Sequence, residues 1–170
     1  MDVKDFFAIE PEKLNENVFD LLGNGWMLVT AGTIDSFNTM TASWGGMGIL
    51  WHKNVCYIVI RPQRYTYTFL EKHPYFTLSF FQEKYRDVLK YCGARSGRDV
   101  NKVNETGITP AQTTNGAVYF KEARLVIECK KIYFQDIDPK NFIDETIAEN
   151  YPSRDFHRMY IGEIVSMMIK

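Results

Sequence analysis

The chain has 170 residues, with 20 basic and 21 acidic side chains and a formal net charge of −1. This balance excludes a general electrostatic attraction for nucleic acid or an anionic membrane, and the length predicts a single domain over residues 1–170. Hydrophobic residues (45%) and aromatic residues (15%) exclude wholesale disorder, and they favour strands, stacked ligands or a buried interface.

The cysteines and histidines do not form a metal-binding or disulfide pattern. Cys56, Cys92 and Cys129 are widely spaced without a CxxC pair, which is typical of reduced thiols. The histidines are dispersed, and for His157 a structural role at the start of the last predicted strand is favoured over a place in a cleft. No apolar run approaches the ~20 residues that cross a bilayer. We therefore expect a cytoplasmic protein without a metal or a membrane contact.

The first part of the chain predicts a helix and a hairpin. A short helix is predicted over Asn15–Leu22 and a strand over Trp26–Thr33. The polar side chains of Asp35–Asn38 favour a turn, after which a second strand, Thr39–Trp44, completes the hairpin. The glycines of Gly45–Gly48 then interrupt the pattern, and they indicate a bulge, a bend or a close approach of the backbone to a neighbour.

The middle of the chain predicts strands that alternate with short helices. The continuous apolar run Val55–Ile60 predicts a strand that is covered on both faces. A helix with Thr66 as its cap is predicted over Thr66–Lys72, and a strand follows over Tyr75–Phe81. The next helix is predicted over Tyr85–Tyr91, with Gly93 just past its end.

The last part of the chain is dominated by two long strands. A short helix over Asp99–Glu105 precedes a strand over Ala123–Gln135, in which a change of phase near Lys130 predicts a bulge. A helix over Phe142–Asn150 leads to the final strand, Arg158–Ile169. Six or seven strands thus follow one another without regular crossover helices. This order predicts a mainly β, antiparallel barrel with short inserted helices, not a doubly wound sheet.

The first candidate binding segment alternates small polar and apolar side chains beside the glycines. A backbone with small side chains can approach a flat heteroaromatic ring closely, and a tryptophan can form a wall against it. An ordinary half-buried hairpin shows the same alternation, so that alternative remains open. The segment comprises Asn38, Thr39, Met40, Thr41, Ala42, Ser43 and Trp44.

The second candidate segment places two arginines around a rigid proline at the start of a helix. Arg61 and Arg64 flank Pro62, and Thr66 follows at once. A phosphate accepts hydrogen bonds from guanidinium groups and from the unpaired amides of a helix start, so this segment is a candidate phosphate cradle. The alternative is a helix cap with two solvated arginines. The segment is not a P-loop, because GxxxxGK[ST] is absent.

The third candidate segment, Gly93–Lys102, is basic and glycine-containing and leads into a helix. Its Lys102 could reach a phosphate or a ring carbonyl, and Ser96 adds a hydroxyl. The alternative is an exposed loop, since loops rich in Gly, Ser and Arg are common. The motifs GxSxG, HExxH and GxGxxG are absent from the sequence.

In this order, the segments resemble the flavin reductase-like, FMN-binding split-barrel family, particularly its flavoredoxin-like branch. The resemblance covers about residues 20 to 170. None of the segments is specific alone, but four of them occur in the order of the family. They are Trp26–Gly32, Asn38–Gly45, Arg61–Thr66 and Ser96–Lys102.

The resemblance implies an antiparallel split β-barrel with FMN at the interface of a homodimer. Asn38, Met40, Thr41, Ala42, Ser43 and Trp44 would line the isoalloxazine and the ribityl chain. Arg61, Arg64 and Thr66 would hold the phosphate region, and Ser96 and Lys102 would close the site. Asn101 stands where the family often carries Asp, which removes one local charge but is not expected to prevent cofactor binding.

The resemblance also implies an oxidoreductase. Members typically accept hydride from NADH or NADPH, or pass electrons between protein partners. Because hydride transfer uses the flavin's own N5, the protein has to bind and tune the ring, and no catalytic residue is predicted. The first expectation is an NAD(P)H-dependent flavin reductase. The second is a flavoredoxin-type electron carrier with permanently bound FMN and a redox protein as partner, and the third is a binding module with an empty barrel.

Overall fold

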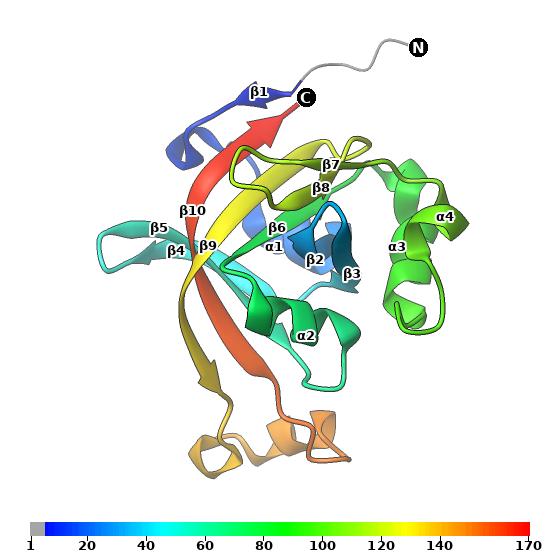
Figure 1. Ribbon diagram of the computed structural model, residues 1–170. Coiled ribbons are helices and arrows are strands. Elements are labelled where there is room, and N and C mark those ends of the chain that lie inside the picture. Colours follow the sequence, from blue (N-terminus) through cyan, green and yellow to red (C-terminus); the bar gives the residue numbers. More distant parts are fainter. Residues whose placement is uncertain (1–5) are drawn as a thin grey trace.

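One antiparallel sheet dominates the computed structural model, which describes residues 6–170 (Figure 1). Within these residues the sheet has eight strands, and every neighbouring pair is antiparallel. Their order is β3 (Ser36–Ala42), β2 (Met27–Thr33), β6 (Tyr75–Phe80), β9 (Leu125–Asp136), β10 (Arg158–Ile169), β5 (Lys53–Ile60) and β4 (Gly45–Leu50), with β1 (Phe7–Ala8) beside β10.

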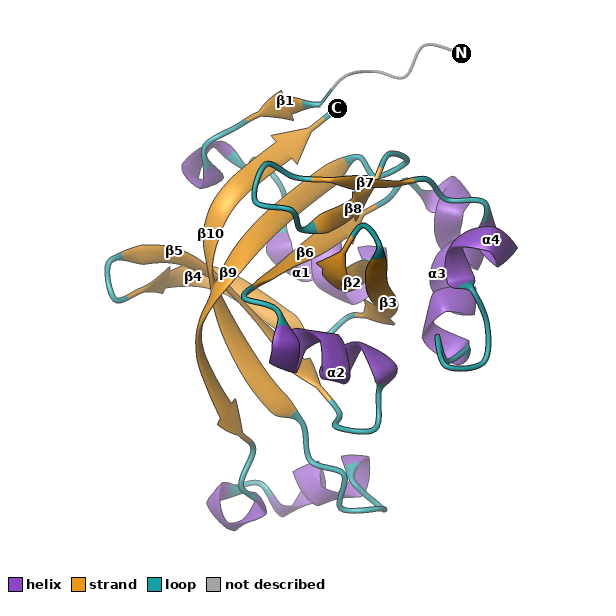
Figure 2. Cartoon of the chain, in the orientation of Figure 1, coloured by secondary structure: helices purple, strands orange, loops and turns teal. Residues whose placement is uncertain are grey.

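Short helices lie around this sheet (Figure 2). The helix α2 (Tyr65–Lys72) connects β5 to β6 and packs against β2 and β3. On another side of β3 lies α3 (Arg86–Ala94), followed by α4 (Lys102–Thr106). The helix α1 (Val18–Asp20) precedes β2, and β7 (Pro110–Gln112) and β8 (Val118–Phe120) form a separate ladder.

The sheet is an open barrel whose two edge strands are adjacent in the chain. β3 and β4 lie at opposite ends of the hydrogen-bonding order, yet only Ser43 and Trp44 separate them in sequence. Ala42 and Gly45 are three Cα–Cα steps apart, at most about 11 Å, so the sheet has to roll until its edges approach each other. The barrel is therefore split between β3 and β4, and Ser43 and Trp44 bridge the split. The predicted fold class, a mainly β split barrel, is confirmed.

Two groups of buried side chains fill the fold. The first lies inside the barrel and includes Met27, Val29, Phe76 and Ile58. The second lies between the sheet and α3; its members are Leu28, Phe81, Leu89, Cys92, Ile108, Phe120, Ala123 and Val126. Met27 and Val29 of β2 thus face the barrel interior, whereas Leu28 between them faces α3. Burying each large apolar side chain stabilises the fold by roughly 1.5–3 kcal/mol. All three cysteines are buried as free thiols.

Most predicted strands are confirmed within a residue or two. The hairpin exists, although its turn is limited to Ile34 and Asp35 and β3 starts at Ser36. The predicted bulge lies in β9, where Tyr133 pairs with Ile161 and Lys131 with Gly162, so the intervening residue has no partner in the register.

The glycine segment is a strand and not an interruption. Gly45–Leu50 forms β4, which pairs along its whole length with β5. The predicted close approach is nevertheless present, because a Cβ on Gly46 would lie 2.3 Å from the ring of Tyr57. Tyr57 is itself 41% exposed, so the expectation that Val55–Ile60 is covered on both faces is wrong for this chain alone. Its apolar run alternates between a buried and an open face.

The helix boundaries differ more from the predicted ones than the strand boundaries do. Arg64 precedes α2 without a side-chain cap, and Thr66 is the second residue of the helix, so the predicted cap at Thr66 is wrong. α3 extends to Ala94 and contains Gly93. The predicted helix Phe142–Asn150 is replaced by two 3₁₀ segments, Pro139–Asn141 and Glu145–Asn150.

The other helices start later than predicted. Asn17 caps α1 by accepting hydrogen bonds from Phe19 and Asp20, and a wide turn of π-helix over Leu21–Gly25 follows. The helix predicted over Asp99–Glu105 is α4, which starts at Lys102. The side chain of Asn101 caps it by accepting a hydrogen bond from the amide of Asn104. The sequence did not predict the short strands β1 and β7.

Gly162 of β10 tests the packing of the barrel interior. A Cβ there would lie 2.6 Å from Cys129 Cβ and 2.8 Å from the ring of Phe76, inside van der Waals contact. We expect Gly162→Ala to lower the free energy of unfolding by roughly 1–3 kcal/mol, as overpacking does. Gly48→Ala is the control, because a Cβ at Gly48 meets nothing within 4 Å. Urea unfolding measures both; equal midpoints for the two variants would contradict this packing.

Candidate functional site

Four hollows adjoin one another along β3, between α2, α3 and the split of the barrel. The outer hollow (about 630 Å³) lies by Phe37, Tyr65 and Phe69, and the middle hollow (about 210 Å³) lies between the start of α2 and Gly93–Gly97. The split hollow (about 200 Å³) lies beside Ser43 and Trp44. The rear hollow (about 390 Å³) lies between Trp26 and α3.

Shared wall residues place these hollows in a row. The outer and middle hollows share Asn38, Tyr65, Gly97 and Lys102. The middle and split hollows share Met40 and Arg64. The rear hollow shares Thr41, Ala42, Ser43 and Arg64 with the split hollow. The site therefore has a linear order, from the outer hollow through the middle hollow to the split of the barrel.

Arg64 lies where the middle, split and rear hollows meet. Its Nη2 donates to the carbonyl oxygen of Gly93 at 3.2 Å, and among the described residues this is the one hydrogen bond of the Arg64 side chain. A guanidinium group has five N–H donors, so most of the donor capacity of Arg64 is not used by the described residues. Burial lowers the pKa of Arg64, and the charge of Arg61 lowers it further. Because both effects disfavour the charged guanidinium, a bound anion would stabilise it.

The wall between the outer and middle hollows depends on one hydrogen bond. Nδ2 of Asn38 donates to Oγ1 of Thr66 at 2.8 Å, which ties β3 to the first turn of α2, and both residues are buried. Gly97 packs against the same amide, because a Cβ there would lie 1.9 Å from Oδ1 of Asn38. Thr66 therefore positions Asn38 and does not cap the helix.

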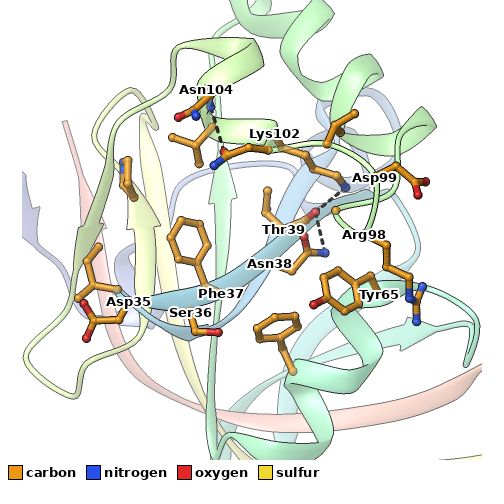
Figure 3. A pocket seen from close by; sticks show the side chains of 17 residues that line it. Asp35, Ser36, Phe37, Asn38, Thr39, Tyr65, Arg98, Asp99, Lys102 and Asn104 are labelled. Carbon is orange, nitrogen blue, oxygen red and sulfur yellow. Dashed lines mark hydrogen bonds between the residues drawn. The ribbon is translucent and has the colours of Figure 1, made fainter.

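Lys102 holds β3 and α3 together from the start of α4. Its Nζ donates to the carbonyl oxygens of Thr39 and Cys92, each at 2.7 Å (Figure 3 draws the first). The side chain is 5% exposed. Burial chiefly, with the charge of Arg64 adding to it, lowers the pKa of Lys102 to about 8. The ammonium is thus close to losing its proton at neutral pH.

Trp44 and His157 form the wall of the split hollow. The Trp44 ring is 48% exposed and lies 5.3 Å from the His157 ring, measured between centroids. His157 is buried, and its Nδ1 lies 2.8 Å from the hydroxyl oxygen of Tyr151. Burial, and then the charge of Arg61, lowers the pKa of His157 to about 4, so the imidazole is neutral at pH 7. Trp44 is accordingly not a core residue.

Arg61 is held by the segment that precedes β10. Its Nη1 forms an ion pair with Asp155 at 2.6 Å, its Nη2 donates to the carbonyl oxygen of Asn150 at 2.8 Å, and its guanidinium lies 5.2 Å from the centroid of the Tyr151 ring. The sequence did not predict Tyr151 or Asp155, because no local pattern relates them to a residue ninety positions earlier. His157 lines the split hollow, and its buried ring with a hydrogen-bond contact to Tyr151 is also consistent with the structural role that the sequence favoured.

All eleven residues that the sequence proposed for the site line at least one of the four hollows. They are Asn38, Met40, Thr41, Ala42, Ser43, Trp44, Arg61, Arg64, Thr66, Ser96 and Lys102. Their role in binding a cofactor stays a prediction.

Among residues 6–170 no group of three or more His, Cys, Asp or Glu side chains could hold a metal ion. No helix of that part of the chain is long and apolar enough to cross a membrane.

Comparison with known proteins agrees with this geometry. The family model of the flavin reductase like domain matches residues 19–170. The chain therefore belongs to the flavin reductase-like domain family, which places it among flavin-related oxidoreductases. A search of curated protein sequences found no match.

Solved structures share the fold at low identity. Flavoredoxin of Desulfovibrio vulgaris (Miyazaki F) has a TM-score of 0.68 and 22% identity, over 95% of this chain and 77% of that chain. An FMN-binding domain of flavin reductases-like enzyme from Shewanella baltica OS155 has a TM-score of 0.70 and 20% identity, over 97% and 77%. The NADH:FAD oxidoreductase of Streptomyces globisporus C-1027 has a TM-score of 0.66 and 15% identity, over 86% and 75%.

The depressed pKa of Lys102 predicts a pH dependence of stability. Its pKa is about 8 in the fold against 10.5 ordinarily, so between these values the unfolded chain binds more protons. The free energy of unfolding should therefore rise with pH, by about 2 kcal/mol between about pH 7.5 and 9.5. Lys102→Met lacks this group, so the difference between wild type and variant isolates it from other titrations. A difference that does not change with pH, measured by urea unfolding of the flavin-free protein, would count against a buried ammonium.

Proposed function

We propose that the chain is an FMN-binding oxidoreductase of the flavin reductase type, which takes hydride from NADH or NADPH and passes electrons to flavin or another acceptor. Family membership supports the flavin chemistry, and the names of the Shewanella and Streptomyces proteins support FMN and NADH as the molecules to test. The observation that carries the proposal is the position of Arg64, a half-buried guanidinium with free donors at the junction of three hollows.

The middle hollow fits a phosphate. Arg64 supplies N–H donors, and the amides of Tyr65 and Thr66 lie in the first turn of α2, where amides have no partner within the helix. Ser96 adds a hydroxyl, and Gly97 leaves room beside Asn38 that a Cβ would fill. The pKa values of Arg64 and Lys102 are both lowered, chiefly by burial. A phosphate would offset this cost.

The split hollow fits the flat ring of a flavin. Ala42 and Ser43 have small side chains, so the backbone of this segment is accessible, and Trp44 offers a half-exposed aromatic face at the edge of the barrel. The neutral His157 and the cations Arg61 and Arg64 line the same space. Cationic groups near a flavin stabilise its anionic reduced form, so these arginines would favour the reduced state.

A bound flavin would supply the hydride chemistry itself, while the residues of the chain bind and orient it. Arg64 and the start of α2 would hold the phosphate end. The wall of Trp44 and His157 would orient the ring and exclude water from one side. This division of roles agrees with a site that contains no nucleophile paired with a general base.

A flavoredoxin-type electron carrier is the second candidate. In that case FMN stays bound and a redox protein, not a nicotinamide, reduces it. The likeness to flavoredoxin of Desulfovibrio vulgaris favours this alternative. The two functions differ in the electron donor, which the second experiment below addresses.

We also propose that the chain forms a homodimer across the open face of β5, β10 and β9. Tyr57, Ile161 and Tyr133 are neighbours in the register of these strands and point to one face, and both tyrosines are 41% exposed. Trp51 lies 5.8 Å from Tyr133 and is also exposed. A second copy would cover this apolar face and lie close to the split hollow. Light scattering tests this; a monomer mass at micromolar concentration would contradict it.

Replacement of Arg64 tests the phosphate cradle. Charge-assisted hydrogen bonds contribute roughly 1.5–3 kcal/mol, so Arg64→Ala should weaken FMN binding by about ten- to a hundredfold. Lys72→Ala removes an exposed cation at the other end of α2 and serves as the control. Flavin fluorescence titration measures both affinities, and the melting temperature reports on the fold. Equal FMN affinity in the two variants would remove Arg64 from the cradle.

Anaerobic addition of NADH or NADPH to the FMN-loaded protein tests the function. We expect the absorbance of the bound flavin to bleach within seconds. Bleaching by a reduced low-potential redox protein, but not by either nicotinamide, would replace the reductase by the electron carrier. A protein that is purified colourless and binds no added FMN would contradict both.

A further inference from the structure

Tyr151 contacts two residues of the split hollow without lining any of the four hollows itself. It follows the 3₁₀ segment Glu145–Asn150 in the connection between β9 and β10. The guanidinium of Arg61 lies over its ring, and its hydroxyl oxygen lies 2.8 Å from Nδ1 of His157. Tyr151 can therefore influence the split hollow only through these two neighbours.

Aromatic packing fixes the position of the Tyr151 ring. Its centroid lies 4.9 Å from that of Phe156 and 6.1 Å from that of Phe142, and both rings belong to the same connection. The backbone amide of Tyr151 donates to the carbonyl oxygen of Ala148 at 2.9 Å, and the residue is 6% exposed. None of these contacts uses the hydroxyl group. Removal of the hydroxyl oxygen should therefore leave the ring in place.

The hydroxyl of Tyr151 has one hydrogen-bond partner among the described residues, Nδ1 of His157. A phenol carries one proton, and a neutral imidazole carries one proton on either of its two nitrogens. If Nδ1 carried that proton, it would donate to the phenol oxygen, and the phenol proton would have no acceptor among the described residues. If the phenol donates to Nδ1, both groups are satisfied. The proton of His157 then lies on Nε2.

Both side chains are neutral at pH 7. Burial raises the pKa of the Tyr151 phenol, against the lowering effects of Arg61 and of the His157 backbone amide. Burial and then Arg61 lower the pKa of His157 to about 4, although the charge of Asp155 acts in the other direction. Since the charge of the imidazole is thus settled, its tautomer is the property that a neighbouring hydrogen bond can set.

Nε2 of His157 is the nitrogen left for the split hollow. Within residues 6–170 it forms no hydrogen bond, and it is not one of the fully buried side-chain atoms without a partner, so it is accessible. His157 lines the split hollow next to Trp44. A proton makes Nε2 a hydrogen-bond donor, whereas the other tautomer presents a lone pair. The tautomer therefore decides which ligand atoms this wall can bind.

We propose that Tyr151 is a positioning residue, which holds His157 in the tautomer with the proton on Nε2 and so gives the split hollow an N–H donor. Such a wall suits a ligand with acceptor atoms at its edge, as the carbonyl oxygens and bare nitrogens of a flavin ring are. The part of the proposal that concerns flavin rests on the proposed function. The tautomer itself is a property of the flavin-free protein.

Nuclear magnetic resonance of the flavin-free protein, labelled with ¹⁵N-histidine, measures the tautomer, because protonated and bare imidazole nitrogens differ in ¹⁵N shift. At about pH 7 we expect a bare Nδ1 and a protonated Nε2 on His157. His157→Gln assigns the signals among the three histidines. In Tyr151→Phe, Nδ1 loses its donor, so both shifts should move towards those of a tautomer mixture. Tyr160→Phe is the matched control, because it removes another buried phenol oxygen, which is bonded to Glu71.

Titration with oxidised and with reduced FMN adds a measurement on the site. Hydrogen bonds to charged acceptors are stronger than those between neutral groups, so the donor should favour the anionic reduced flavin. We expect Tyr151→Phe to lower the ratio of the affinities for reduced and oxidised FMN by roughly threefold. In Tyr160→Phe we expect the ratio of the wild type.

A proton on Nδ1 of His157 in the wild type would overturn the proposal, and this result does not depend on the folding of a variant. Equal ¹⁵N shifts in the wild type and Tyr151→Phe would also overturn it, as would an affinity ratio equal to that of the control. The proposed function fails in a different way, by the absence of FMN binding in the wild type. In that case the ¹⁵N shifts still decide whether Tyr151 sets the tautomer.

Discussion

The two-residue connection between β3 and β4 is the constraint on which the rest of this structure depends. Because Ser43 and Trp44 alone join the two edges of the sheet, the strands have to roll into a barrel and cannot spread flat. The same closure brings the end of β5, with Arg61, next to Met40 of β3. The split of the barrel is thus the place where the edge strands β3 and β4 are not paired with each other, and where residues from distant strands line one hollow.

The middle of the site is held together against electrostatic repulsion. The charge of Arg61 disfavours the charged form of Arg64, and the charge of Arg64 disfavours that of the buried Lys102. Asp155 pairs with Arg61, while Arg64 and Lys102 find backbone carbonyls as partners. Carbonyl oxygens carry only partial charges, so they compensate an ammonium or a guanidinium incompletely. A site of this kind selects anions without any feature specific to one ligand.

The sequence predicted the strands and the members of the site better than it predicted their roles. Alternation and glycine position are local, which is why β2, β6, β9 and β10 were found. β4 was missed because glycines are poor strand formers, and its pairing depends on Tyr57, whose ring covers Gly46. Thr66 has the local pattern of a cap, but its partner is Asn38, twenty-eight residues away. Similarly, no local pattern relates Asp155 to Arg61.

The burial of the three cysteines has a chemical consequence for a protein of this class. Reduced flavins react with oxygen and release hydrogen peroxide, which attacks thiolates and not thiols. Burial raises the pKa of Cys92 to about 11 and raises that of Cys129 well above its usual value. At neutral pH these two sulfurs therefore remain protonated and, together with Cys56, out of contact with solvent. Peroxide formed by a reduced flavin would therefore find poor targets in the cysteines of this chain.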